Sequence, residues 1–169
     1  MYEFSVAIFR HSLRNLSALL RRGAAYAEER RMPPMVLLEM RLAPGMFPLG
    51  EQVRAVSYHA LAAVANLVGE KPPDFERDYK SLAELLAEID TTLTRLDALT
   101  VAQFEGAATR LITLDLRRGL VRLDGRHSLA HFALPNFFFH LTTAYDILRH
   151  YGVAVGKADF LGDVGGVAS

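Results

Sequence analysis

The histidines of this chain come nearest to a recognisable metal-binding or catalytic motif. The six of them are His11, His59, His127, His131, His140 and His150. His127 and His131 are four residues apart, a spacing that lets two imidazoles on one helical face bind the same metal ion. The HExxH pattern, which would add a general base, is absent. Without that motif, His127 and His131 are expected to be structural residues just before the last long helix. Metal binding by the two is the alternative.

His59 and His140 are the better candidates for a site between helices. His140 lies at the edge of the apolar face of the last long helix, and His59 follows Tyr58 on the second one. Bundles build ligand and metal sites from side chains on facing helices. A bundle can therefore bring His59 and His140 together, either at a functional pocket or as structural histidines that donate to nearby hydroxyl or backbone groups. We expect His11 and His150 to be exposed.

Other catalytic patterns are missing from the chain. It has no cysteine, which excludes disulfides, zinc-thiolate sites and a thiol nucleophile of its own. No Glu-x-x-His pair is present, so a carboxylate di-iron centre is not expected. The GxSxG, P-loop and GxGxxG patterns are also absent, and these mark common hydrolase and nucleotide sites.

Length and composition indicate one domain over residues 1–169, with a loose tail over residues 161–169. Lys+Arg and Asp+Glu both number 19, and this balance argues against a nucleic-acid partner. No run approaches the ~18 apolar residues of a membrane span, and the start lacks the apolar core of a signal peptide. We expect a cytoplasmic protein. Its hydrophobic fraction of 51% is compatible with surface buried in a homodimer.

Four amphipathic segments predict the helices that would position the histidines. They cover residues 2–30, 48–68, 82–96 and 130–152. Ser81 and Glu84 form a capping box before the third segment, and Gly69 is a C-cap for the second. The predicted fold is an all-α four-helix bundle.

Smaller elements complete this prediction. A short apolar segment, residues 35–42, is expected to pack as a helical plug. Residues 109–124 change to a period of two, which predicts a small β-hairpin turning at residues 117–119 before the last helix. We expect that helix to begin near Arg126 and to change direction at Pro135. The glycine-bearing stretch 152–166 is interpreted as a C-terminal loop.

The last helix has a predicted core face. Phe138, Leu141, Tyr145 and Leu148 recur at spacings of three, four and three, which places them on one side of a helix. Phe137 and Ala144 are expected to widen that face. Three consecutive phenylalanines at 137–139 cannot all point inward, so at least one should meet another element or a second subunit.

Three stretches resemble a known family. They are HFALPNFFFHLTTAYDILRHYGVAVGKADFLG (131–162), RLAPGMFPLGEQV (41–53) and AQFEG (102–106). Together they are similar to an uncharacterised bacterial family, a domain of unknown function within the DinB/YfiT-like superfamily of proposed metalloenzymes. The resemblance implies a DinB/YfiT-like four-helix bundle that is commonly a homodimer.

The superfamily also implies a metal pattern, from which this sequence departs. Characterised members include thiol-dependent transferases that hold a divalent metal, such as nickel or zinc, with three histidines. One histidine comes from the second helix and two from an HxxxH pair on the fourth. The pair falls on Asn136 and His140 here, and the second-helix position falls nearer Ala55 than His59. The resemblance therefore implies a metal site that is degraded or reorganised, because asparagine is a poor ligand for zinc or nickel beside imidazole.

These observations leave three functions open. The first is a DinB-like bundle that binds a small molecule or partner without obligatory metal, in a pocket formed by Asn136, His140, Tyr145, His59 and Tyr58. The second is a divalent-metal-dependent transferase of the thiol-dependent type, or a hydrolase, using His140 with His59 or His131. The third is a structural or interaction protein with no small-molecule site, in which the aromatic residues serve packing alone.

Overall fold

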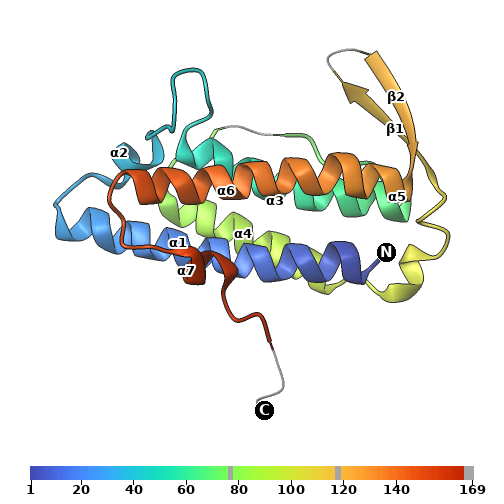
Figure 1. The fold of residues 1–169 in the computed structure, drawn as a ribbon, viewed down its shortest axis with the longest axis horizontal. Coiled ribbons are helices and arrows are strands. Elements are labelled where there is room, and N and C mark those ends of the chain that lie inside the picture. Colours follow the sequence, from blue (N-terminus) through green and yellow to red (C-terminus); the bar gives the residue numbers. More distant parts are fainter. Residues whose placement is uncertain (76–77, 117–118, 166–169) are drawn as a thin grey trace.

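Four long helices form the bundle that the amphipathic pattern predicts, with a two-stranded hairpin at one end (Figure 1). The computed structural model describes residues 1–75, 78–116 and 119–165. The long helices are α1 (Ile8–Glu29), α3 (Leu49–Val68), α4 (Leu82–Asp97) and α6 (Leu134–His150). The short elements are α2 (Pro34–Leu38), a 3₁₀ turn (Val101–Phe104), β1 (Leu111–Leu116), β2 (Gly119–Asp124), α5 (Gly125–Ser128) and α7 (Lys157–Leu161).

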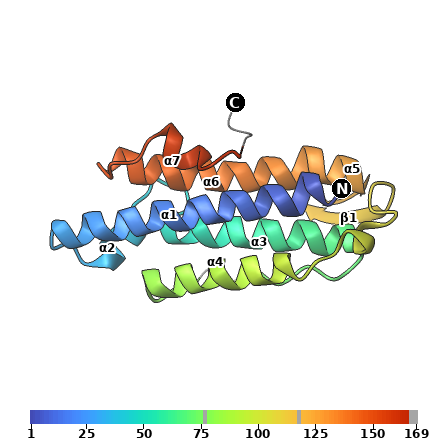
Figure 2. The same cartoon turned by 90° about the horizontal axis from the view of Figure 1, so that it is seen from below.

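The long helices run side by side around one core (Figure 2). α3 packs between α4 and α6, and α1 contacts both of these helices from the other side. Small residues such as Ala60 and Ala63 on α3 permit the close approach of its neighbours. The fully buried side chains include Phe9, Leu13, Leu16, Leu20, Val56, Leu85, Ile89, Phe137 and Leu148. None of the helices in the described part of the chain combines the length and apolar character of a membrane span.

The predicted helix ends are confirmed with one difference. Gly69 adopts φ +84° after α3, and the next amide donates to Ala65 O at 2.8 Å, as a left-handed C-cap requires. Ser81 Oγ accepts the Glu84 amide at 3.1 Å. The Glu84 carboxylate reaches past Ser81 to the amide of Lys80, at 2.9 Å, so the reciprocal bond of the capping box is displaced by one residue.

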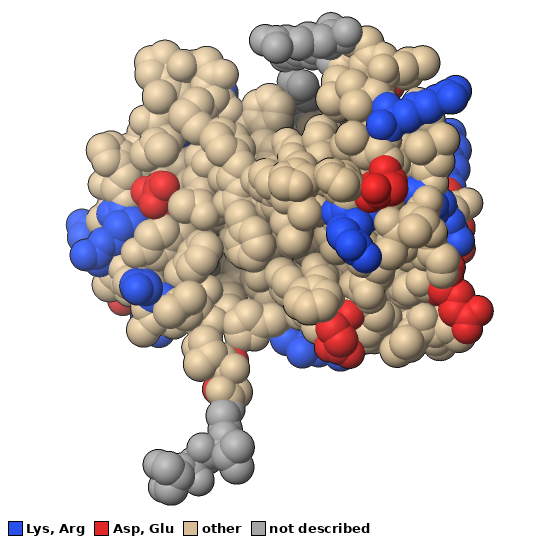
Figure 3. Space-filling model, turned by 45° about the vertical axis from the view of Figure 1, so that its right-hand side comes forward, with Lys and Arg blue, Asp and Glu red and all other residues tan. Residues whose placement is uncertain are grey.

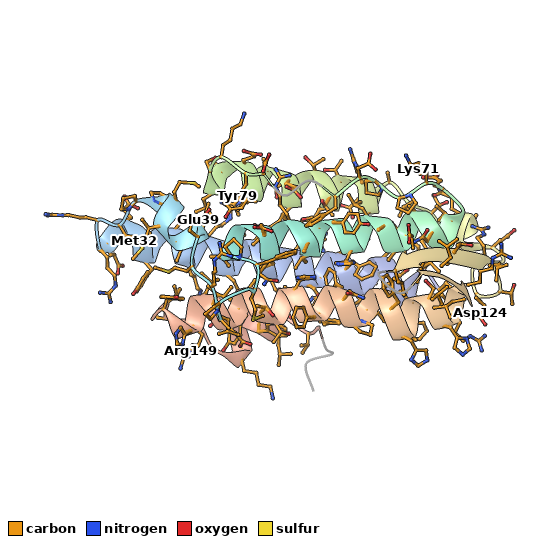
Figure 4. The ribbon with its side chains drawn as sticks, turned by 90° about the horizontal axis from the view of Figure 1, so that it is seen from above. Met32, Glu39, Lys71, Tyr79, Asp124 and Arg149 are labelled. Atoms are coloured by element: carbon orange, nitrogen blue, oxygen red, sulfur yellow. The ribbon has the colours of Figure 1, made fainter. Side chains whose placement is uncertain are left out.

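The predicted plug is also present as α2, which buries Leu37 and Leu38. Tyr79, which lies three residues before α4, anchors the plug because its hydroxyl donates to Glu39 Oε1 at 2.7 Å (Figure 4). Gly50 makes room for the Tyr79 ring, since a Cβ at this glycine would meet the ring carbons. The plug therefore closes one end of the bundle.

The hairpin at the opposite end pairs Leu111 with Asp124 and Leu116 with Gly119. Ile112 and Leu114 are buried, on the face that the alternation predicts. The predicted turn residues Arg117 and Arg118 lie outside the described residues.

The core face of α6 differs from the predicted one. Phe137 is fully buried and contacts Phe9 at a ring-centroid distance of 4.7 Å. Phe138, predicted at the core, is 36% exposed, so this assignment was wrong. Phe137 and Phe138 lie four and three residues before Leu141, and both spacings suit one helical face. The periodicity alone therefore could not choose between them.

A wider, π-helical turn (Leu129–Ala133) joins α5 to α6. Pro135 follows it, and a proline inside a helix lacks the amide donor and crowds the carbonyl four residues earlier. Widening of the preceding turn accommodates that ring. The predicted redirection at Pro135 thus takes the form of a local change in helical pitch.

The C-terminal stretch is more ordered than the predicted loop. Val153 and Val155 are buried, and α7 docks on α1. Leu161 O accepts from Asn15 Nδ2 at 2.9 Å and lies 2.7 Å from His11 Nε2. The loop assignment was therefore wrong for residues 157–161, and His11 is half-buried against α7 instead of exposed. Residues 162–165 have no regular structure, and residues 166–169 lie outside the described residues.

Candidate functional site

His59 of α3 and His140 of α6 meet where these two helices pack. Their ring centroids are 5.2 Å apart and the rings are nearly parallel, at 14°. Both side chains are half-buried. The structure therefore brings together the two histidines that the sequence singles out.

Gln52 fixes the orientation of His140. The Gln52 amide nitrogen donates to Phe47 O at 3.1 Å, so its oxygen is the atom that faces His140 Nδ1, at 2.7 Å. An amide oxygen only accepts, so Nδ1 must carry the proton. His140 Nε2 is consequently left with a lone pair that can accept a hydrogen bond or bind a metal ion.

Both imidazoles are neutral at physiological pH. Burial and, to a smaller extent, the charge that His140 carries when protonated lower the pKa of His59 from 6.5 to about 4. Burial alone lowers the pKa of His140 from 6.5 to about 4. Neutral imidazoles are good acceptors and ligands. With a pKa this low they are poor general bases at neutral pH, because an efficient base titrates near the working pH.

Aromatic side chains surround the two histidines. Phe47 lies nearly parallel to His140 at a centroid distance of 6.0 Å. Tyr58 contacts His59 edge-on at 5.2 Å, and its ring also lies 5.0 Å from Phe75. The predicted pair Tyr58 and His59 therefore belongs to one half-buried aromatic cluster, in which flat and apolar groups are well accommodated.

Asn136 and Tyr145 are not part of this cluster. Asn136 Nδ2 donates to Phe132 O at 2.7 Å, which ties its side chain to the backbone of the wider turn before α6. Tyr145 packs edge-on against Phe160 at 5.5 Å. It is five residues after His140, a rotation of about 140° around a helix, and it faces α7. The structure does not bring Tyr145 together with His140.

His127 and His131 lie at the beginning of the last helical segment, away from His140. His127 Nδ1 is 3.0 Å from Asp124 Oδ2, and its ring centroid is 5.5 Å from that of His131. Both are exposed. His131 precedes His140 by nine residues, which is about 13 Å along a helix axis. His131 and His140 therefore cannot share one metal ion.

The side chains present do not match a three-histidine metal site. Ala55, at the expected second-helix position, is buried and has no donor atom. Asn136 is bound to the backbone, as described above. Within residues 1–75, 78–116 and 119–165, no three His, Cys, Asp or Glu side chains are grouped so that they could hold a metal ion. His59 and His140 remain as two candidate ligands, one fewer than catalytic zinc sites usually take from the protein.

The sequence reasoning missed Gln52. It lies seven residues before His59, which is two helical turns and therefore the same face of α3. That spacing places Gln52 near His59 but carries no information on its partner His140, which is 88 residues away.

Two cavities adjoin the cluster. His59 lines a cavity of about 20 Å³ next to the wider turn, which is room for a water molecule. Tyr58 lines a much larger one, of about 550 Å³, on the α4 side of α3.

Comparisons with known proteins agree with this fold. The model of one family, a domain of unknown function (DUF1993), matches residues 1–161. The crystal structure of a DinB family member protein from Shewanella denitrificans is 38% identical, with a TM-score of 0.91. That match covers 99% of this chain and 95% of the other. No curated protein matches the chain. The chain therefore belongs to the DUF1993 family and has a DinB-like fold.

Proposed function

We propose that this protein binds a small, uncharged, planar molecule at the His59–His140 cluster, without an obligatory metal ion. The observation that carries the proposal is the pair of neutral imidazoles, one of which has its tautomer fixed by Gln52. A site whose acceptor is oriented in advance loses little entropy when it binds a donor. The surrounding Phe47 and Tyr58 rings favour a flat partner.

The proposal specifies the chemistry of the ligand. His140 Nε2 offers an acceptor, so the ligand should present an N–H or O–H group in the plane of an aromatic or amide system. A cation would gain little from two neutral rings that offer no negative charge.

The test uses indole and 2-pyridone as probes, followed through the histidine ring signals in NMR spectra. Binding should shift the His59 and His140 signals in the wild-type protein, and His140→Ala should abolish the shifts at His59. His150→Ala is the matched control, because it removes an exposed histidine from the same helix. If neither probe binds, or if His140→Ala binds as well as wild type, the cluster is packing and the interaction-protein class is favoured instead.

The alternative function is a divalent-metal-dependent transferase or hydrolase in which His140 and His59 bind nickel or zinc. It is supported by the same 5.2 Å ring distance, because imidazoles this close can bind one ion. It is weakened by the missing third ligand described above.

Elemental analysis of untagged protein, purified without chelator and then reloaded with nickel or zinc, separates the two functions. The metal-free proposal predicts far less than one metal ion per chain in wild type. Near-stoichiometric metal that is lost in both His140→Ala and His59→Ala would establish the alternative.

We also propose that the protein is a homodimer formed through the face of α1 and α6. Phe4 is 69% exposed and lies one turn before Ile8 on α1. Ile8, Phe138 and Leu161 line an open groove of about 460 Å³ between α1, α6 and α7. Figure 3 shows a broad region in the middle of one side of the molecule with few charged side chains. Depletion of charge around exposed aromatic residues is typical of subunit interfaces.

A further inference from the structure

The small cavity beside His59 has three polar groups in an otherwise apolar lining. They are His59 and Asn66 of α3 and Ser128 of α5. The cavity volume of about 20 Å³ is enough for one water molecule, and a buried water molecule typically makes about three hydrogen bonds. Because the cavity holds a single small molecule, all three polar side chains lie close to the same point.

Two of these polar groups have no protein partner. Ser128 is 4% exposed, and its hydroxyl forms no hydrogen bond with another group among the described residues. The ring of His59 contacts Tyr58 and His140, but within the same part of the chain neither of its nitrogens is hydrogen-bonded to a protein group. Buried polar groups are nearly always satisfied by protein or by ordered water. Water in the cavity would satisfy both groups.

The wider turn (Leu129–Ala133) supplies the wall of the cavity opposite α3, where Phe132 and Ala133 line it. A π-helical turn is broader than an α-helical one and is frequently found at functional sites. Asn136 Nδ2 donates to Phe132 O at 2.7 Å, which holds the backbone of this turn in place. The cavity therefore follows from the geometry of the helix itself.

His59 and His140 differ in how their rings are held. Gln52 accepts from His140 Nδ1 at 2.7 Å and so determines which nitrogen of that ring carries the proton. A hydrogen bond at one ring nitrogen determines the state of the other nitrogen in any neutral imidazole. A hydrogen bond through water is nearly as favourable in enthalpy as a direct one. Water in the cavity can therefore do for His59 what Gln52 does for His140.

We propose that a bound water molecule links His59 to Ser128 and Asn66, and that these two residues position the His59 imidazole through it. The hydroxyl of Ser128 and the amide of Asn66 can each donate and accept, so together they hold the water in one orientation. His59 then presents the same ring nitrogen in every molecule. The value of this for ligand binding rests on the proposed function, whereas the water and the tautomer of His59 do not.

The first test needs no ligand. A high-resolution crystal structure of the full chain should contain an ordered water molecule within hydrogen-bonding distance of both His59 and Ser128. The ¹⁵N shifts of the His59 ring nitrogens, measured at neutral pH, should show one dominant tautomer, because a protonated and an unprotonated nitrogen differ in shift. A cavity without water, or an even mixture of the two tautomers, would overturn the proposal.

Variants test the positioning role. Ser128→Ala should change the ratio of the two His59 tautomers about two- to tenfold, as expected for one lost hydrogen bond. Asn66→Leu, which keeps the size of the side chain, should also change it. Ser5→Ala is the matched control, since Ser5 is a fully buried serine outside the lining. An unchanged ratio in Ser128→Ala, or an equal change in Ser5→Ala, would contradict the assignment.

Binding of 2-pyridone separates this inference from the proposed function. Ser128→Ala should weaken it about two- to tenfold, because the His59 ring is no longer held in one state. If 2-pyridone fails to bind the wild-type protein while the tautomer ratio responds to Ser128→Ala, the proposed function fails and the water site stands. If 2-pyridone binds and the ratio does not respond, the proposed function stands and this inference is overturned.

Discussion

The two clustered histidines make the stability of the protein depend on pH. In the unfolded chain a histidine takes up a proton near pH 6.5, whereas His59 and His140 in the fold do so only near pH 4. Between these values the unfolded state binds more protons, so the free energy of unfolding falls as the pH is lowered. The loss should be about 1–3 kcal/mol for each histidine, allowing for partial exposure.

Urea denaturation at pH 7.5, 5.5 and 4.5 measures this dependence, and NMR titration of the ring signals assigns it. His140→Phe should flatten the profile, whereas His150→Gln should leave it unchanged. Ring signals of His59 and His140 that titrate near pH 6.5 would show that the two imidazoles are not desolvated as described.

Some individual residues of the candidate site were predicted from the sequence. His59, Tyr58 and His140 were identified because helical spacing places them at the margins of apolar faces. Tyr145 was grouped with His140 because His140 was placed at the edge of the apolar face that includes Tyr145, although five residues rotate a side chain by about 140°. The link between Gln52 and His140 joins residues 88 positions apart, and local periodicity carries no information on such a pair.

Among the elements, α6 gives the sharpest stability prediction. Phe137→Ala should lower the free energy of unfolding by about 3–5 kcal/mol, because it opens a cavity in a closely packed core. Phe139→Ala is the matched control on the same helix, and its ring, which is 56% exposed, should cost less than about 1.5 kcal/mol. Both are measured by urea denaturation of the purified variants. Equal losses would mean that the helix has a different rotation from the one described.

The long helices, the capping serine and the hairpin were predictable because each has a repeated or local signal. The docked helix α7 was not, since five residues are too few to show a period and glycines flank them. Its position depends on Asn15 and His11, which are about 145–150 residues earlier in the chain. An element that is held mainly by distant partners is not visible in its own sequence.

For the whole molecule, the proposed homodimer predicts that negative charges introduced at its interface prevent dimer formation. Phe4→Glu combined with Phe138→Glu should convert a dimer into a folded monomer, because unpaired charge at an interface core is strongly unfavourable. Val36→Glu is the control, since this exposed apolar side chain lies on α2 at the other end of the bundle. Analytical ultracentrifugation measures the mass. A monomeric wild-type protein, or a dimer in the double variant, would refute the proposed interface.

The docking of α7 on α1 has a consequence for protein synthesis. α1 leaves the ribosome well over a hundred residues before the segment that covers its outer side, as the separation of 150 residues between His11 and Leu161 shows. During that interval the surface of α1 around His11 and Asn15, on which α7 docks, is uncovered, and exposed apolar surface is what makes incompletely folded chains prone to aggregate and to bind chaperones. Docking of the last segment on α1 is therefore the closing step of folding, and it can begin only after synthesis of the whole bundle.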